Sequence, residues 1–339
     1  MSSAHPTGVV HFGLGPIGLA VAALVAERPW LRSVAAVDVH PQLHGRRLAE
    51  LTGRPARDGS PDVASAYRPV AGAAVAVHCT SSSLDRVAPQ IVELAASGLN
   101  VVSTTEELSF PWEAHPRAAA EIDAAARGAG VTVLGTGINP GFAMDYLAMS
   151  LSAVAQRVER VEIHRVQDAG TRRLPLQRKI GAGMEPDAFR AAVAEGRLGH
   201  VGLSESAHML ARAFGWRLTG LDERIEPICA EAPTATAEGV VEEGRVLGIH
   251  QTAVARAGGE IVVSLTLDMA IGIGPARDHV RLVGTPDLEL EVPGGLHGDT
   301  ATAAIVVNAI PRVLAAPPGL TTMAELAPPT PGTPPAEGS

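Results

Sequence analysis

The chain has 339 residues, of which 46% are hydrophobic and 19% are charged, so it is long enough for two domains with a large core. Its formal net charge of −9 argues against a surface for nucleic acid or an anionic membrane, because both need concentrated Lys and Arg. Two cysteines, Cys79 and Cys229, are too few for a disulfide framework, and no metal-ligand spacing is visible. The first residues lack the pattern of a secretion signal, and no apolar run reaches about 18 residues. We expect a cytoplasmic, metal-free protein that acts on a small molecule.

The first 140 residues alternate short β-branched runs with Ala- and Leu-rich helical stretches. Continuous apolar strands that alternate with helices are typical of a parallel sheet covered on both faces. We therefore expect an α/β fold, with a Rossmann-type doubly wound parallel sheet over residues 1–140. The expected strands are 8–13, 33–38, 74–80, 100–104 and 130–136, and the expected helices are 17–28, 43–51, 84–97 and 116–127.

From Val158 the pattern changes, because β-rich runs lie close together and two helices interrupt only between the first run and the second. Grouped strands predict a mostly antiparallel sheet, hence a second α+β domain over residues 141–298 that binds substrate and forms a dimer. A last helix over residues 300–316, kinked at Pro311, is expected to pack back on the first domain, which residues 299–326 complete. The Pro-rich tail 327–339 is expected to be disordered.

A glycine-rich loop follows the first strand. Gly13, Gly15 and Gly18 stand between this strand and a helix, and Asp38 ends the second strand about 20 residues later. The glycines allow a tight turn, a close approach of the backbone to a pyrophosphate and close packing of helix on strand. The pattern predicts a dinucleotide site. The expected cofactor contacts are Gly13, Leu14, Gly15, Pro16, Ile17, Gly18, Asp38, Thr80, Ser81 and Asn139.

The choice between NAD and NADP depends on the residues at the end of the second strand. Asp38 can accept hydrogen bonds from the ribose hydroxyls and would repel a 2′-phosphate, which favours NAD. His40, Arg46 and Arg47 follow closely and could hold that phosphate, so NADP stays open. Thr80 and Ser81 are placed to contact the nicotinamide ribose, although they could equally cap the helix that begins near residue 84.

Glu106 and Glu107 come directly after the run 100–104. Ligands of an open α/β sheet bind outside the carboxyl ends of the strands, so side chains that follow a strand can reach the substrate. A carboxylate at this position in a dinucleotide-binding domain indicates hydride chemistry at a cationic or carbonyl-derived centre.

Two later segments point to a ligand. The segment 135–146 turns sharply after Asn139, because the next residue is proline, and its glycines leave backbone amides open. The segment 171–183 concentrates four Arg and Lys side chains in an otherwise acidic chain. These cations can hold an anion or shape a pocket, or they can simply be solvated.

Taken together, the motifs resemble those of the 2,4-diaminopentanoate dehydrogenases and related native amine dehydrogenases, within the dihydrodipicolinate-reductase-like superfamily. The likeness runs nearly end to end. The motifs are STTEELSFPW, GTGINPGFAMDY, TRRLPLQRKIGAG, GHVGLSESAHML, GDTATAAIVVNAIP and PPGLTTMAEL. The resemblance implies NAD(P)H-dependent reductive amination of a carbonyl with ammonia, reversible as oxidative deamination. It also implies a catalytic Glu after the fifth strand and a homodimer formed through the second domain.

We assign the catalytic role to Glu106, with Glu107 in reserve, by comparison with the homoserine dehydrogenases, where a functional lysine takes the corresponding place. In the alternative, both glutamates cap the following turn. His208 is expected to be structural, on a helix whose apolar stripe includes Leu203 and Leu210. The expected substrate-pocket residues are Ile138, Phe142, Arg173 and His200.

Three alternatives stay open from the sequence. The enzyme could be a 2,4-diaminopentanoate dehydrogenase proper, which needs partners for a carboxylate and a second ammonium, whereas simple ketones need an apolar pocket. It could be an imine reductase of the dihydrodipicolinate-reductase type, or a non-catalytic NAD(P) sensor. The strand 260–272 is mostly apolar, with Leu265 and Leu267 taken to lie on opposite faces, which predicts that a second copy covers one of them.

Overall fold

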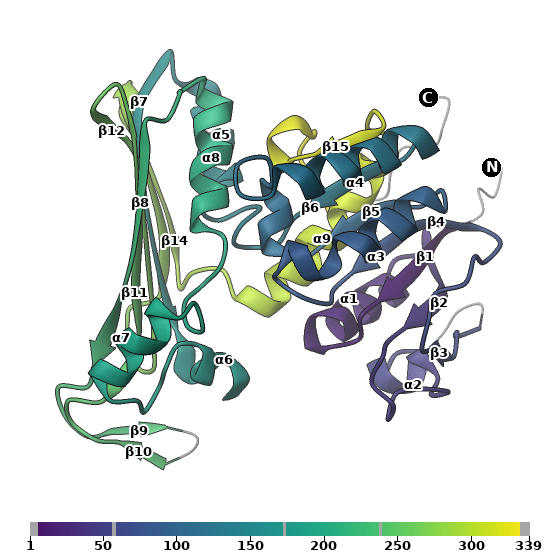
Figure 1. Cartoon of the computed structure of the whole chain (residues 1–339), viewed down its shortest axis with the longest axis horizontal. Helices are drawn as coiled ribbons and strands as arrows, with labels where there is room; N and C mark the ends of the chain where they lie inside the picture. The colour runs from purple at the N-terminus through teal and green to yellow at the C-terminus, as the bar shows by residue number, and fades with distance from the viewer. Residues whose placement is uncertain (1–5, 56–58, 172–173, 237–238, 333–339) are drawn as a thin grey trace. The chain divides into compact units, whose positions relative to one another are not determined.

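The computed structural model describes residues 6–55, 59–171, 174–236 and 239–332. The chain divides into two compact units (Figure 1). Unit 1 comprises Met1–Phe142 together with His297–Ser339, and unit 2 comprises Ala143–Leu296. Unit 1 is thus built from both ends of the chain, and unit 2 is inserted between them.

The sheet of unit 1 has seven strands in the described residues, in the order β15-β6-β5-β4-β1-β2-β3, and every neighbouring pair is parallel. Its strands are β1 (Thr7–Phe12), β2 (Leu31–Val37), β3 (Val63–Ala64), β4 (Ala73–His78), β5 (Asn100–Ser103), β6 (Thr132–Gly135) and β15 (Gly319–Thr321). Because β2 and β4 flank β1, the direction of winding reverses beside β1. At such a switch point, α/β sheets bind ligands at the carboxyl ends of the strands.

Helices cover both faces of this sheet. On one face α3 (Leu84–Ala96) packs against α4 (Pro116–Ala129), and on the other α1 (Pro16–Glu27) packs against α9 (Gly298–Leu314) (Figure 1). The short helix α2 (Leu48–Thr52) packs on α1. Since the central strands are covered from both sides, Val9, Val75 and Val101 are fully buried. The predicted Rossmann-type α/β fold is confirmed.

Several local expectations for unit 1 need correction. The helix expected over residues 43–51 forms only as α2, and α9 ends at Leu314 and contains Pro311. The strand β15 is not among the expected strands, and Asp123 fixes it by accepting a hydrogen bond from Leu320 N at 2.9 Å. Part of the expected disordered tail is described: Arg312 Nε donates to Pro328 O at 3.0 Å. Residues 333–339 lie outside the described residues.

The larger sheet of unit 2 has six strands in the described residues, in the order β14-β13-β7-β12-β11-β8. Only β7 and β12 pair in parallel, so the predicted, mostly antiparallel second sheet is confirmed. The strands are β7 (Arg157–Asp168), β8 (Gly220–Cys229), β11 (Val246–Ala257), β12 (Glu260–Ala270), β13 (Arg277–Thr285) and β14 (Leu288–Pro293). A separate hairpin consists of β9 (Thr234–Thr236) and β10 (Gly239–Val241).

The helices of unit 2 pack on one face of this sheet (Figure 1). They include α5 (Tyr146–Leu151), α7 (Pro186–Ala194) and α8 (Leu203–Phe214), and a further short helix is α6 (Leu174–Lys179). Short 3-10 turns are η1 (Glu106–Ser109), η2 (Ser152–Val154), η3 (Ala169–Thr171) and η4 (Met323–Glu325). The expected apolar stripe lies on α8, where Leu203 and Leu210 are fully buried.

The expectation of two apolar faces on β12 is wrong. Leu265 and Leu267 are both fully buried, and side chains two residues apart in a strand point to the same face. The alternate residues Ser264, Thr266 and Asp268 are only partly buried and point to the opposite face. The open face of the sheet is therefore polar.

This open face carries a linked group of ionisable side chains. Asp268 of β12 contacts His164 Nε2 of β7 and His250 Nδ1 of β11, both at 2.6 Å. Partial burial acts against ionisation of Asp268, but the hydrogen bonds from both histidines hold its pKa below the ordinary value. The three side chains tie neighbouring strands together.

Candidate functional site

The glycine loop after β1 has the geometry that its motif predicts. Gly13 has φ of +90°, and a β-carbon there would lie 2.5 Å from Cys79 O. A β-carbon at Gly18 would lie 2.0 Å from Gly13 O, so helix and loop pack too closely for any side chain. At Gly15, by contrast, no described atom lies within 4 Å of such a β-carbon. A ligand can therefore approach the backbone at Gly15.

The start of α1 suits an anion. Gly15 is the N-cap residue, Pro16 opens the helix, and no described side chain caps it. The first turn holds no acidic residue. Since the first N–H groups of a helix lack partners within it and its dipole favours negative charge, this end can receive a phosphate. The loop therefore fits the pyrophosphate of a dinucleotide.

Asp38 is fixed at the end of β2 by two backbone amides. Its Oδ2 accepts from Leu14 N at 2.6 Å, and its Oδ1 accepts from His40 N at 2.7 Å. The carboxylate is thus joined to the glycine loop. Val39, the next residue, is 82% exposed. An acceptor and an exposed apolar side chain are therefore adjacent in the chain at the end of β2.

Thr80 and Ser81 follow β4, and the alternative in which they cap α3 is wrong. The N-cap of α3 is Ser83, and Leu84 N donates to Glu107 instead. Ser81 Oγ accepts only from Ser83 N, at 3.3 Å, among its described backbone contacts in this turn. Thr80 is exposed, and its hydroxyl lies 3.0 Å from His78 Nε2. Neither residue is needed to start the helix.

Glu106 and Glu107 both lie in η1, directly after β5, but Glu107 has a structural role. Its Oε2 accepts from Leu84 N at 2.6 Å and lies 3.1 Å from His115 Nε2. The carboxylate thereby caps α3, where the helix dipole favours a negative charge. The alternative reading therefore needs correction, since Glu107 caps the preceding helix and not the following turn. The catalytic role expected for Glu106 stays a prediction.

The loop after β6 is anchored from two sides. Ile138 and Asn139 are each only 8% exposed, and Ile138 N donates to Thr302 Oγ1 of α9 at 3.3 Å. Gly141 has φ of +120°, and a β-carbon there would lie 2.5 Å from Gly137 N. A side chain at Gly141 would therefore force the loop apart.

In unit 2 a buried glutamine holds His200. Gln251 Oε1 accepts from His200 N at 2.8 Å, and Gln251 Nε2 donates to His200 O at 2.7 Å. The same Nε2 also donates to Glu223 Oε1. Gln251 is fully buried, and its amide group holds the His200 backbone in place through these two hydrogen bonds. His208 Nδ1 contacts Ser204 O within α8 at 2.9 Å, which fits the structural role expected for it.

Of the two remaining predicted pocket residues, the structure describes Phe142 but not Arg173. Phe142 is partly buried and is the last residue of the first segment of unit 1. Arg173 lies outside the described residues. Among the described residues, no cluster of three or more His, Cys, Asp or Glu could hold a metal ion. Likewise, none of the described helices is long and apolar enough to cross a bilayer.

The family model for the 2,4-diaminopentanoate dehydrogenase C-terminal domain matches residues 142–333. The 2,4-diaminopentanoate dehydrogenase of Acetoanaerobium sticklandii is 31% identical over 94% of this chain and 92% of its own length. The chain belongs to the 2,4-diaminopentanoate dehydrogenase family. It is therefore an oxidoreductase for amine donors that uses a nicotinamide cofactor.

Solved structures agree on the fold. The amine dehydrogenase from Mycobacterium smegmatis superposes with a TM-score of 0.82, at 24% identity, over 97% of this chain and 98% of its own. GenD2 of gentamicin A biosynthesis, solved in complex with NAD, gives a TM-score of 0.52 at 15% identity over 86% of this chain and 74% of its own. Both comparisons show a similarity of fold.

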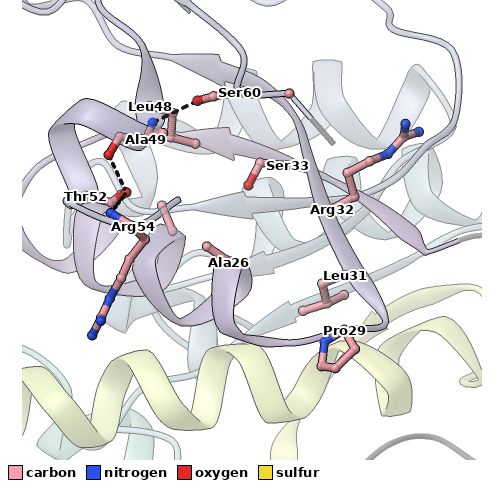
Figure 2. Close-up of a pocket in the computed structure, with 12 residues that line it drawn as sticks. Ala26, Pro29, Leu31, Arg32, Ser33, Leu48, Ala49, Thr52, Arg54 and Ser60 are labelled. Carbon is pink, nitrogen blue, oxygen red and sulfur yellow. Dashed lines mark hydrogen bonds between the residues drawn. The ribbon is translucent and has the colours of Figure 1, made fainter. Parts of the chain in front are cut away.

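The pocket drawn in Figure 2 is not the cofactor site of this family member. It lies between α1, β2 and α2 and has a volume of about 50 Å³. Its walls include Pro29 and Leu31 at the amino end of β2, whereas Asp38 follows the carboxyl end. Arg54 extends away from the pocket in this view and pairs with Glu27 at 2.8 Å. The pocket is too small for a dinucleotide and lies at the wrong end of the strand.

Proposed function

We propose that the chain catalyses the reversible reductive amination of a ketone or aldehyde with ammonia. The balanced reaction takes the carbonyl compound, ammonium, NAD(P)H and one proton to the alkylammonium ion, NAD(P)⁺ and water. Family membership supports this proposal, and so does the position of Glu106 after β5 in the same sheet as the glycine loop. Family membership is the single observation that carries the proposal, and the choice of Glu106 over Glu107 follows from the resemblance.

Unit 1 would hold the cofactor, through the Gly13–Gly18 loop, Asp38, Thr80, Ser81 and Asn139. When bound, the nicotinamide supplies the hydride in amine formation and accepts it in the reverse direction. The open backbone at Gly15 and the carboxylate of Asp38 support this assignment. From unit 2 we propose that His200, fixed by Gln251, takes part in substrate recognition.

Glu106 would move protons during amine formation. As a base it takes a proton from ammonium, so that the nitrogen lone pair can attack the carbonyl carbon and form the C–N bond. The carbonyl-derived oxygen then receives two protons, the one that Glu106 took from ammonium and one that Glu106 passes on from the newly attached nitrogen, so the C–O bond breaks and water leaves. The ionised carboxylate next favours the iminium cation, which is the form that accepts hydride. In the reverse direction the same group takes a proton from the alkylammonium and activates water.

An assay for NADH or NADPH oxidation tests the proposal. Oxidation is expected only when both ammonium and a ketone or aldehyde are present. Turnover of the carbonyl compound without ammonium would make the enzyme a carbonyl reductase, and turnover of a cyclic imine alone would make it an imine reductase. Cofactor binding without any turnover would identify a sensor.

A second candidate substrate is 2,4-diaminopentanoate itself, because the relative at 31% identity is the dehydrogenase of that compound. Simple aliphatic ketones would instead need an apolar pocket, for which Ile138 and Phe142 are available. Met144 is fully buried and belongs to the core of unit 2. Oxidation of 2,4-diaminopentanoate, compared at equal concentration with 2-aminobutane and cyclohexylamine, separates the two substrate classes.

Replacing Asp38 with Ala is expected to raise the preference for NADPH. The change removes the charge that would repel a 2′-phosphate, while the exposed Arg46 and Arg47 remain. Arg47 Nε lies 3.9 Å from Asp62 Oδ1, which is a loose contact. The Arg47 side chain can therefore still reorient toward a phosphate. The ratio of kcat/KM for the two coenzymes measures the effect. An unchanged ratio would mean that Asp38 does not meet the ribose; Asp62→Ala serves as a control for the loss of a nearby carboxylate.

We propose that two copies of the chain form a homodimer through the open face of the unit 2 sheet. The face presents charged and polar groups such as His164, His250 and Asp268, which two antiparallel copies can pair reciprocally. Family resemblance supports the same assembly. The interface would bury roughly 2,000 Å².

Light scattering at low micromolar concentration is expected to give twice the chain mass of 34.9 kDa. Thr266→Arg, on the open face, is expected to give a folded monomer, because a buried cation without a partner opposes association. Leu267→Arg, on the helix-covered face, is expected to unfold the unit instead. A wild-type monomer, or a Thr266→Arg dimer, would contradict the interface.

A further inference from the structure

A buried histidine lies beneath both loops to which the proposed function assigns chemistry. His78 ends β4 and is fully buried. Its Nδ1 lies 2.9 Å from Ser103 Oγ at the end of β5, and its Nε2 lies 3.0 Å from Thr80 Oγ1. No motif of the sequence draws attention to it.

The hydrogen bonds continue from Ser103 back to the cofactor loop. Ser103 Oγ donates to Thr105 Oγ1 at 3.0 Å, and Thr105 Oγ1 donates to Ser81 O at 2.9 Å. Thr105 N also donates to Ser103 Oγ at 3.1 Å. The result is a circuit that runs from Thr80 through His78, Ser103 and Thr105 to Ser81. Thr105 is the N-cap of η1, so the next residue on the chain is Glu106.

The Thr105 end of this circuit has a fixed proton direction. The Ser81 carbonyl can only accept, so the Thr105 hydroxyl donates to it, and Ser103 in turn donates to Thr105. Burial lowers the pKa of His78 to about 4, so the ring is neutral near pH 7 and carries one N–H.

Gln90 also contacts this end of the ring. Its Oε1 lies 2.9 Å from His78 Nε2 and accepts from the Thr80 hydroxyl at 3.3 Å. The ring is therefore held at both nitrogens by neutral partners.

We propose that His78 is a positioning residue, which fixes the cofactor loop at Thr80 and Ser81 against the turn that carries Glu106. The circuit sets the spacing between the groups expected at the nicotinamide ribose and the carboxylate expected at the substrate. Because the Thr80 hydroxyl donates its proton inward, it can meet a ligand only as an acceptor, which suits a ribose hydroxyl. The inference rests on the proposed function for the roles of Thr80 and Glu106.

The test compares His78→Gln with His11→Asn. Gln is too flexible to bridge Ser103 and Thr80 as the ring does. His11 is the matched control: it is also buried, on β1, burial also lowers its pKa to about 4, and it bonds Ser33 Oγ at 2.9 Å. It contacts neither loop of the circuit. Both variants lose a buried imidazole, so a general loss of stability appears in both.

In His78→Gln, kcat is expected to fall about 10- to 100-fold, since a misplacement near 1 Å costs this much. The dissociation constant for NADH, from its fluorescence, is expected to change by only about twofold, because Asp38 and the glycine loop are intact. In cofactor-free protein, hydrogen exchange measured by mass spectrometry is expected to quicken in peptides 78–84 and 103–112 together. His11→Asn is expected to change none of these three readouts.

An unchanged kcat in His78→Gln, or faster exchange in only one of the two peptides, overturns the inference. If His78→Gln does not fold, Thr105→Val and Thr105→Ser decide: the first removes the hydroxyl link and should reproduce the loss, and the second keeps it and should not. If the wild-type protein has no amine-forming turnover, the proposed function fails, while coupled exchange in the cofactor-free protein still reports whether the circuit exists.

Discussion

Replacing Glu106 with Gln is expected to lower kcat for amine formation by about 10² to 10⁴, the usual loss when a general base is removed. The change keeps the size of the side chain and removes only its charge and its capacity to take a proton. NADH binding in unit 1 should therefore be nearly unchanged, because the glycine loop and Asp38 are intact. Steady-state kinetics with saturating ammonium and ketone, together with NADH fluorescence titration, measure both quantities.

Glu107→Gln is the matched control for this experiment. It alters the cap of α3, where Glu107 Oε2 accepts from Leu84 N and lies near His115, so a loss of about 0.5–2 kcal/mol of stability is expected. The effect on kcat should be far smaller than that of Glu106→Gln. If the order is reversed, Glu107 is the catalytic carboxylate, and if both variants stay active the proposed mechanism is wrong.

The parts of the fold that were predictable have local causes. Runs of Val and Ala with no polar interruption follow from burial on both faces, and the glycine spacing follows from the turn between β1 and α1. The stripe on α8 repeats with the helical period, and its residues Leu203 and Leu210 are buried as expected. Each of these signals lies within about a dozen residues of sequence.

The parts that were not predictable depend on residues far apart in the chain. The cap of α3 by Glu107 spans 23 positions, and the clamp on His200 by Gln251 spans 51. No local pattern marks a glutamine in a strand as a partner for a distant backbone. The choice of Glu106 over Glu107 therefore rests on the comparison with relatives, and the contact with Leu84 N explains only the role of Glu107.

The two faces of β12 show a different kind of limit. The sequence of this strand alternates Leu with Ser, Thr and Asp over its middle, which by itself predicts one apolar face and one polar face. Leu265 and Leu267 are two positions apart in this strand, so they lie on the same face and not on opposite faces. The dimer proposed through this face would therefore depend on polar pairing and not on apolar burial.

The second large effect is expected at the buried ion pair of unit 2. Arg165 of β7 donates to Asp278 Oδ1 of β13 at 2.6 Å, and their side chains are 3% and 0% exposed. Arg165 also donates to Leu296 O at 2.6 Å, and Leu296 N donates to Asp278 Oδ2 at 2.7 Å. Three groups are therefore closed into one network at the last residue of the unit.

Arg165→Met is expected to destabilise the protein by about 3–5 kcal/mol, because it leaves a buried carboxylate without its cation. For a unit of this size, the loss corresponds to a fall in Tm of roughly 6–20 °C, measurable by calorimetry. Asp187→Asn, which breaks the exposed pair of Asp187 with Arg190, is the control and should leave Tm unchanged. A fall in Tm as small as that of the control would contradict the role of the network.

The loss of stability caused by Arg165→Met should also depend on pH. Burial raises the pKa of Asp278 even in the intact protein, where Arg165 acts against this shift, so the folded-state pKa must rise further in the variant. An acid whose pKa is higher in the folded chain than in the unfolded chain costs stability as the pH rises above the unfolded value of about 4. The difference in Tm between wild type and variant is therefore expected to be larger at pH 8 than at pH 5. A difference that is constant over this range would mean that the loss comes from packing and from the broken bond to Leu296 and not from an unpaired charge.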